Sequence, residues 1–180
     1  MIKEIQQVRD KAFQIFLTLK NFQLSVDGVG YAGRVTELTP PTLSTKSEEY
    51  RAGGMDAPYY IDMGSEAMEA EFTVSEYNEE LIQQWGLQDT NAVQLTARGA
   101  MQRPGEDAVA IVINLRGCIK ELDMGSFQSG ELTECNFTMG VSYYRVEIGG
   151  TNLIEIDIEN MTRLIGGTDQ LASMRTALGI

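Results

Sequence analysis

Apolar and polar residues alternate along most of the chain, and this period of two predicts β-strands. The alternation is clearest from Met68 to Ser75, where Glu69, Glu71 and Thr73 separate the apolar positions. Further strand-like stretches cover residues 22–26, 31–38, 93–101, 108–119, 132–148 and 153–158. The stretch 108–119 is nearly continuous in Val and Ile, which favours a central place in a sheet. The stretch 132–148 is long enough to bend across two sheets.

Three segments have helical rather than strand-like spacing. Residues 2–19 carry apolar side chains at intervals of three and four, which predicts a helical arm packed on its own domain or on a neighbouring subunit. The stripe consists of Ile5, Val8, Ala12, Ile15 and Leu19. Asn78 suits the N-cap of a short helix that Gly86 closes, and Thr168 suits the N-cap of a last helix that ends at Gly179. In that last helix the inward positions are Leu171, Ala172, Met174 and Leu178.

These patterns predict a mainly β protein, a β-sandwich or a partly open antiparallel barrel, with about seven strands and few helices. Residues 1–20 form an N-terminal helical extension and residues 21–180 form one β-sandwich domain. Asp27-Gly28 and Gly149-Gly150 are typical of tight turns between antiparallel strands. Pro40-Pro41 ends regular structure, so residues 40–64 are expected to form an extended arm.

Composition narrows the function classes. The chain has 14 basic and 26 acidic residues, a net charge of −12, and no histidine. Four basic and two acidic residues give residues 1–20 a charge of +2, so the other residues carry −14. An acidic body does not bind DNA through phosphate contacts, although DNA can slide along it. The lack of histidine removes the common catalytic triads and histidine zinc sites. No signal peptide is recognisable, and Cys118 and Cys135 are expected as free thiols of a reducing compartment.

Candidate chemical motifs have simpler structural explanations. Residues 28–33 match G-x-G-x-x-G, but no helix follows, so a glycine-rich hairpin turn is favoured over a dinucleotide site. Glu69 and Glu71 could serve as a catalytic carboxylate pair, but nothing nearby forms an apolar pocket that would separate their pKa values. A solvated strand face or an acidic wall are the alternatives. Residues 155–159 alternate acids with isoleucine and lack the order of a calcium loop. No cofactor or metal is expected.

The segment from Tyr50 to Pro58 combines two adjacent glycines, a proline and an aromatic residue within the expected arm. Glycine adopts backbone angles that other residues avoid, and proline fixes an extended neighbour. Long loops inside a compact domain are usually functional or disordered, and this arm has neither low complexity nor heavy charge. We therefore expect it to become ordered against a partner.

Motifs along the chain together resemble one family. They lie at residues 21–28, 31–33, 50–58, 62–64, 66–70, 115–117, 120–121, 141–144, 155–157, 167, 169–171 and 175–179. They are similar to the major tail tube proteins of contractile-tailed phages and of the related R-type pyocins. The resemblance covers about residues 21–180, and residues 1–20 look like an extension beyond the usual start of that family.

The resemblance implies a structural subunit rather than an enzyme. Six subunits would form a ring whose inner wall is a continuous β-barrel, and rings would stack into a tube inside a contractile sheath. The arm would contact neighbouring subunits and the next ring through Tyr50, Arg51, Ala52, Gly53, Gly54, Met55, Asp56 and Pro58. Implied partners are the sheath, tape measure, baseplate and terminator proteins, with no stable membrane binding. Assembly would take place in the bacterial cytoplasm, and the product would be a virion tail or a tailocin particle.

The acidic strand face is the candidate lining of the lumen, with Glu69, Glu71 and Thr73 as its residues. DNA would pass such a wall without specific binding because both carry negative charge. The sequence leaves open whether the tube belongs to a phage, a pyocin or another injection system. A small acidic hydrolase or a carbohydrate-binding β-sandwich is the alternative from a different class.

Overall fold

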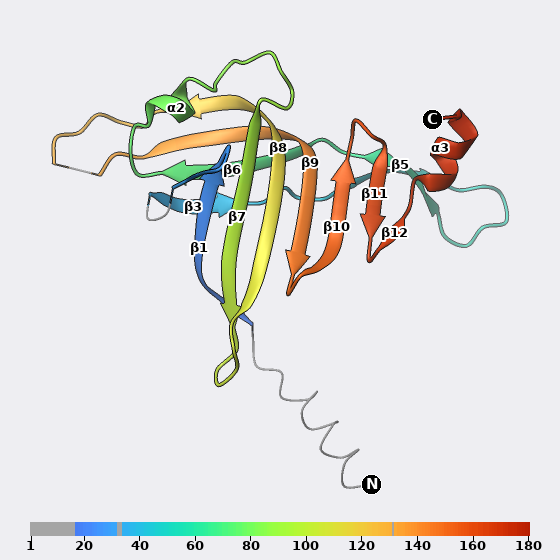
Figure 1. The fold of residues 1–180 in the computed structure, drawn as a ribbon. Coiled ribbons are helices and arrows are strands. Elements are labelled where there is room, and N and C mark those ends of the chain that lie inside the picture. The colour runs from blue at the N-terminus through green and yellow to red at the C-terminus, as the bar shows by residue number, and fades with distance from the viewer. Residues whose placement is uncertain (1–16, 32–33, 131) are drawn as a thin grey trace, which may run out of the picture.

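The computed structural model describes residues 17–31, 34–130 and 132–180, which form one ten-stranded sheet, one two-stranded sheet and two short helices. Figure 1 shows the strands β1 and β7–β12 standing side by side, with β3 and β6 crossing behind them. The strands are β1 (Thr18–Val26), β2 (Val29–Gly30), β3 (Val35–Thr39), β4 (Thr45–Tyr50), β5 (Tyr59–Ser65), β6 (Met68–Val74), β7 (Val93–Gln102), β8 (Val109–Asp123), β9 (Cys135–Ile148), β10 (Thr151–Asp157), β11 (Thr162–Ile165) and β12 (Thr168–Asp169). The helices are α2 (Glu79–Ile82) and α3 (Ala172–Leu178).

The large sheet folds over itself into two layers because β8 and β9 are long enough to belong to both. On one edge β9 pairs with β6 through residues 135–141 and with β10 through residues 143–148. We call these two layers the outer and the inner layer. The outer layer has the strand order β12-β11-β10-β9-β8-β7-β1-β2, and the inner layer has the strand order β3-β6-β9-β8. At the bend, a Cβ on Gly117 would lie 1.9 Å from the carbonyl oxygen of Gly140, so the close approach of the two strands requires glycine.

Alternating apolar side chains of the two layers meet in one core. In the inner layer, Phe72 of β6 lies opposite Phe137 of β9, with stacked rings whose centroids are 4.9 Å apart. Leu24, Leu95 and Leu115 of the outer layer are 1–2 % exposed and belong to the same cluster. No polar or charged residue of the described ranges is buried. Burial of alternating apolar residues is therefore the main stabilising term.

Most of the expected elements are confirmed. β6 has the burial alternation that its sequence predicts, and β9 bends between two pairing partners. The side chain of Asn78 accepts a hydrogen bond from the Leu81 amide and caps α2. The expectation that Gly86 closes this helix is wrong, because α2 ends at Ile82 and Gln83 is its C-cap. Asp27 and Gly28 form a tight turn with positive φ angles of 48° and 83° between β1 and β2. The described part of the glycine-rich run, residues 28–31, thus begins in a hairpin turn and contains no helix.

Two expectations about the ends of the chain need correction. Thr168 caps no helix, because Thr168 and Asp169 pair with β11 as β12, and Leu171 is the N-cap of α3 without a side-chain hydrogen bond. The helix α3 buries none of its residues, whereas inward packing was expected for its apolar positions. Gly179 does end it in the left-handed conformation.

The remaining differences concern the first strand and the number of strands. The helix expected over residues 2–19 does not extend to its predicted end, since β1 begins at Thr18 and pairs with β7. Residues 1–16 lie outside the described residues. The described residues form twelve strands rather than about seven, because the arm and the C-terminal region contain short strands.

Candidate functional site

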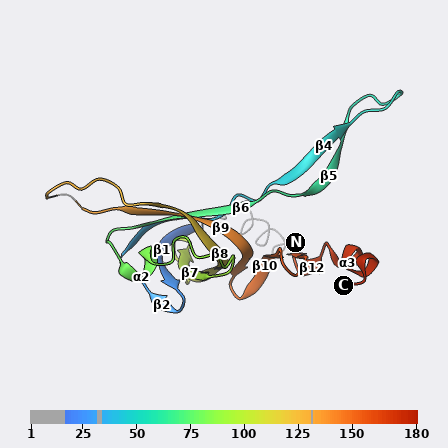
Figure 2. The same cartoon turned by 90° about the horizontal axis from the view of Figure 1, so that it is seen from above.

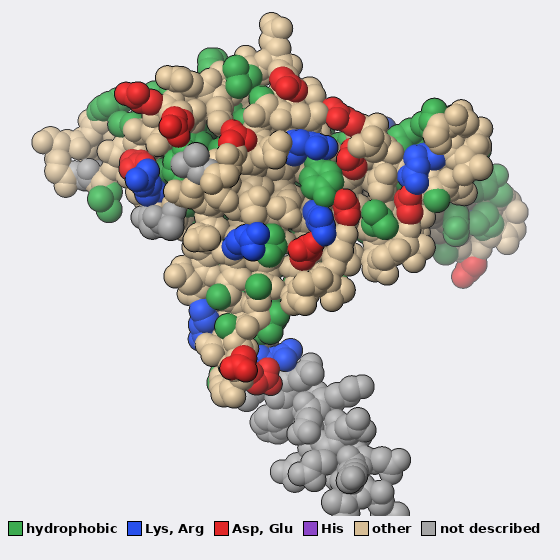
Figure 3. Space-filling model, in the orientation of Figure 1, with side chains coloured by type: hydrophobic (Ala, Val, Ile, Leu, Met, Phe, Trp, Pro, Cys, Tyr) green, Lys and Arg blue, Asp and Glu red, His purple; other side chains and the backbone are tan. Residues whose placement is uncertain are grey.

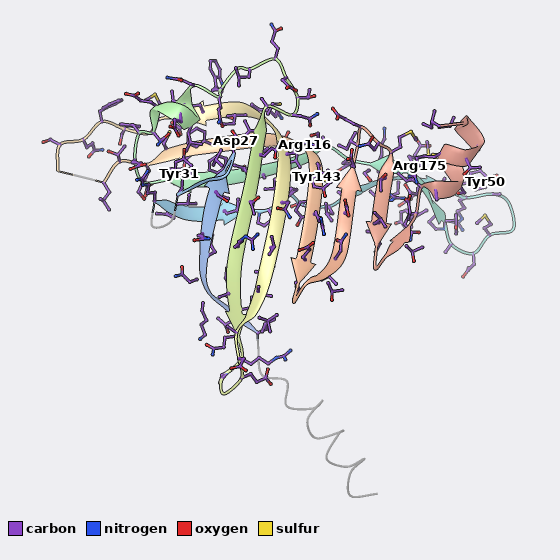
Figure 4. All side chains as sticks on the ribbon, viewed as in Figure 1. Asp27, Tyr31, Tyr50, Arg116, Tyr143 and Arg175 are labelled. Atoms are coloured by element: carbon purple, nitrogen blue, oxygen red, sulfur yellow. The ribbon has the colours of Figure 1, made fainter. Side chains whose placement is uncertain are left out.

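The expected arm is a β-hairpin that projects away from both layers (Figure 2). Its strands β4 and β5 pair in an antiparallel ladder that ends at Tyr50 opposite Tyr59. At the tip, the Met55 amide donates to the Ala52 carbonyl at 3.2 Å, and Gly54 has a φ of 90°. Only Gly54 therefore needs the freedom of glycine, while Gly53 has ordinary angles and open space around it. Tyr50 is labelled in Figure 4 at the start of this tip.

The two faces of the hairpin differ in polarity. Along β5, Tyr59, Ile61 and Met63 alternate and are 66 %, 41 % and 52 % exposed, so one face presents an apolar ridge. On the opposite face Tyr60 donates a hydrogen bond to the Glu49 carboxylate at 2.9 Å, and this bond raises the pKa of Tyr60. Every residue of β4 and β5 is exposed. An isolated two-stranded hairpin is only marginally stable in water, and exposed apolar ridges of this kind are typical of interaction surfaces.

Arg163 of β11 connects the base of the hairpin to the outer layer. Its guanidinium lies 3.5 Å from the Asp62 carboxylate and donates to the Ser65 hydroxyl at 3.4 Å. A hollow of about 480 Å³ lies beside this contact, between the base of the hairpin and β10–β12. The polar contacts of Arg163 set the direction in which the hairpin leaves the body.

The solvent-facing side of the inner layer is a polar and acidic wall that spans four strands. Register places the side chains in two rows across β3, β6, β9 and β8. One row is Glu37, Thr73, Asn136 and Asp123, and the next is Thr39, Glu71, Thr138 and Glu121. Thr73 donates a hydrogen bond to the Asn136 side chain at 2.8 Å. The wall thus extends the predicted acidic face of β6 onto three further strands.

Glu69 lies on the same face but differs from Glu71 because it forms an ion pair. Lys120, which lies in a bulge of β8, donates to the Glu69 carboxylate, and this hydrogen bond raises the pKa of Lys120. Its side chain passes over Gly140, where a Cβ would lie 3.0 Å from it. Of the two predicted carboxylates, Glu71 is therefore the one without an ion pair of its own among the described residues.

The inner layer has an open edge on each side. On one side β3 pairs only with β6. On the other side β7 pairs with β8 no further than Gly117. Beyond that point no described strand pairs with this edge of β8, but Trp85 forms a bridge with Ile119 and donates its indole N–H to the Lys120 carbonyl at 3.3 Å. Open edges present unpaired amides and carbonyls that can pair with another chain.

Comparison of the whole chain with known proteins identifies its family. Residues 17–179 match the model of the family described as phage tail tube protein FII. The chain belongs to this tail tube protein family. It is 30 % identical over 166 residues to the tail tube protein of Escherichia phage P2, covering 90 % of this chain and 96 % of that protein. It is 31 % identical over 144 residues to the major tail tube protein of Serratia phage KSP20, covering 79 % of this chain and 83 % of that protein.

Solved structures share the fold at lower identity. Chains from an extracellular contractile injection system superpose with a TM-score of 0.57. One comes from its sheath/tube terminator, with 15 % sequence identity, and covers 76 % of this chain and 98 % of that chain. The other comes from its sheath-tube complex, with 14 % sequence identity, and covers 78 % of this chain and 95 % of that chain. Family membership and the two phage relatives make this chain a structural protein of a virion tail or contractile injection particle rather than an acidic hydrolase.

The outer face of this tail tube protein carries a different pattern, with both charges interleaved over β8–β10 (Figure 3). Arg116 lies 3.5 Å from the Asp157 carboxylate and 5.0 Å from the centre of the Tyr143 ring. Arg116 and Tyr143 are labelled in Figure 4. Burial acts to raise the pKa of Asp157, but hydrogen bonds from Asn160 and the charge of Arg116 lower it overall. This face is electrostatically mixed, whereas the inner wall is acidic.

Arg175 ties the C-terminal helix of this tail tube protein, none of whose residues is buried, to the preceding strands. Its guanidinium donates to the Met161 carbonyl at 2.7 Å and to the Asp169 carboxylate, which lowers the pKa of Asp169. Met174 and Leu178 of α3 are 53 % and 61 % exposed. No helix of the described residues is long and apolar enough to cross a membrane.

Sequence reasoning found the hairpin tip and the acidic face of β6 but missed residues that complete both. Glu37, Glu121 and Asp123 join the wall only through register, although each precedes or follows an apolar residue of its strand. Arg163 gave no signal, because it contacts Asp62, which is distant in sequence. Arg175 lies in the 175–179 motif, but its contact with Asp169 of β12 was not predicted. The hairpin tip and the wall lie on different elements and form two separate surfaces.

Proposed function

We propose that six copies of this chain form a ring in which the free edge of β3 pairs with the free edge of β8 of the next copy. The observation that carries this proposal is the pair of open edges at opposite sides of one four-stranded layer. Edge pairing around a ring satisfies the exposed backbone groups and removes both edges. The structural relatives, which come from tube-containing particles, support this reading.

Six layers of four strands would give a closed barrel lined by the acidic wall. With a spacing of about 4.8 Å between strands, its diameter is roughly 37 Å before strand tilt widens it. The two polar rows across the inner layer would continue from one subunit to the next. The apolar side of the same layer stays packed on the core through Phe72 and Phe137.

The hairpin would join rings into a tube. It leaves the inner layer at the end opposite to the loop that connects β8 and β9 (Figure 2). A contact between opposite ends of a subunit is head-to-tail, and such contacts propagate into filaments when they do not close. The ridge of Tyr59, Ile61 and Met63 would be covered by a neighbouring subunit or by the next ring, as would the tip from Tyr50 to Pro58.

The acidic wall would let DNA pass without adhering in a phage, whereas in a pyocin-like particle the same tube would puncture the target envelope. Glu37, Glu71, Glu121 and Asp123 have no ion pair of their own among the described residues, and Lys120 offsets only Glu69. Six copies of these four carboxylates repel phosphate and leave no counterion release to drive binding. The further partners would be the sheath, tape measure, baseplate and terminator proteins.

Electron microscopy of the purified protein at rising concentration tests the assembly. Hollow tubes with six-fold end views are expected. A ring of another order would contradict the hexamer, and a protein that stays monomeric at all concentrations would contradict self-assembly through open edges.

Charge reversal tests the lining of the lumen. Glu71→Lys together with Glu69→Lys should leave tubes intact and slow DNA ejection, because phosphate would then bind the wall. The matched control is Glu106→Lys with Asp107→Lys, which changes the charge equally in the turn between β7 and β8. Normal ejection from the inner-wall variant, or equal slowing in both, would contradict the assignment.

A further inference from the structure

An apolar groove lies on the body, away from the hairpin and the acidic wall. It has a volume of about 270 Å³ and is formed where the inward side of β1, β7 and β8 passes the end of β3. Its lining has no charged residue and consists of Leu19, Phe22, Leu38, Pro40, Ala97, Gly99, Met101, Ile111 and Ile113. Within the part of the chain that the structure describes, no other segment fills it.

Local irregularity in β1 turns its first residues toward this groove. The pairing of β1 with β7 shifts between Leu19 and Asn21, so one extra residue is inserted there. A bulge re-aims the side chains on either side of it. As a result Leu19 points to the same side as Phe22, and its side chain lies over Gly99, where a Cβ would be 2.6 Å away.

Leu19 is also the last member of the apolar stripe that begins at Ile5. The stripe has helical spacing, and the residues between its members are mostly polar. The family match begins at residue 17, so the stripe precedes the domain that the family shares. The apolar stripe therefore ends, at Leu19, at the rim of an apolar groove.

We propose that residues 2–16 of the same chain fold back onto the body and insert Ile15, with Ala12 and Val8, into this groove. Continuity of the chain favours this occupant over a second copy, because Ile15 lies only four residues before Leu19, and Leu19 already lines the groove. A tethered segment binds at a high effective concentration. Charge favours it as well, since residues 2–16 carry +1, from three basic and two acidic residues, and the chain as a whole carries −12.

The small volume limits what the groove can take. It has room for a few aliphatic side chains and not for a whole helix, so the segment would lie across the rim with its stripe inward. The polar residues Gln7 and Gln14 would then face solvent. The inference is independent of ring assembly, and it can be tested on the unassembled subunit.

The first experiment compares two variants with the same change in charge. Val8→Asp with Ile15→Asp should release the segment and raise the binding of a hydrophobic fluorescent dye several-fold. Gln7→Asp with Gln14→Asp should leave dye binding at the wild-type level. Both pairs lie outside the family domain, so thermal unfolding of the body serves as a check that it stays folded. Equal dye binding in the two variants would overturn the proposal.

The second experiment identifies the occupant by cross-linking. Ile15→Cys and Ile111→Cys are combined with Cys118→Ser and Cys135→Ala, and the dilute protein is treated with a short bis-maleimide. We expect a cross-link within one chain. Its yield should be several-fold higher than in the control, in which Gln7→Cys replaces Ile15→Cys. Links mainly between chains would show that a second copy covers the groove and would overturn the proposal, as would the absence of any link.

Discussion

Tyr59 offers a direct test of the hairpin as an assembly surface. Its side chain lies on the apolar face of β5 and is 66 % exposed in the single subunit. Replacing it with serine removes the aromatic side chain, which adds little to the stability of the single subunit because it is mostly exposed. The free energy of unfolding of the subunit should therefore change by no more than about 0.5 kcal/mol.

The effect on assembly follows from the surface area of the Tyr59 side chain that is exposed in the single subunit. A tyrosine buries on the order of 200 Å² when it is fully covered, so about two thirds of that area remains for a partner. At about 25 cal/mol per Å², covering it contributes about 3 kcal/mol to each intersubunit contact. Loss of this contact should raise the concentration needed for tube formation on the order of 100-fold.

Tyr60 supplies the matched control on the next position of the same strand. It is 62 % exposed, but it lies on the opposite face, where its hydroxyl donates to Glu49. Tube formation by the wild type, Tyr59→Ser and Tyr60→Ser is measured by sedimentation across a concentration series. Equal loss of assembly in both variants, or normal assembly of Tyr59→Ser, would refute the role of the apolar ridge.

Three other changes have distinct expected outcomes. Gly54→Val should strain the hairpin tip by about 1–2 kcal/mol and block stacking, measured by microscopy, whereas Gly53→Val should not. The pKa of Asp157 is lowered, so its ionised carboxylate stabilises the folded subunit at neutral pH, and this stabilisation is lost as the pH falls below about 4. Asp157→Asn should therefore flatten the acidic part of a plot of melting temperature against pH. Phe72→Ala should lower the free energy of unfolding by about 3–5 kcal/mol in denaturant titrations, and a loss below 1 kcal/mol would contradict its core role.

Period-two patterns predicted strands well because burial on one face follows directly from alternation. β6 and β9 were recognised for that reason, and so was the bend of β9. The C-terminal region was less predictable. Thr168 and Asp169 are too short a strand to show a period, and a cap-like residue before an apolar run gave the same signal as a helix start.

The candidate surfaces divide in the same way. Glu69, Glu71 and Thr73 were found because they alternate within one strand. Their neighbours in the wall depend on cross-strand register, which no local pattern encodes. The tip from Tyr50 to Pro58 was found from its glycines and proline, but the pairing of Tyr50 with Tyr59 that makes it a hairpin is not visible in a single segment.

The mainly β class, the acidic character, the tight turns and the family can be read from composition, short-range periodicity and motifs. The fold is needed to see which strands meet, that four of them share an acidic wall, and that among the described residues no strand pairs with the outer edge of β3 or with the end of β8. These features arise from pairing between residues far apart in the chain. Such pairing closes a long loop of the chain, and its entropic cost is offset by the packing of the whole core rather than by any one segment.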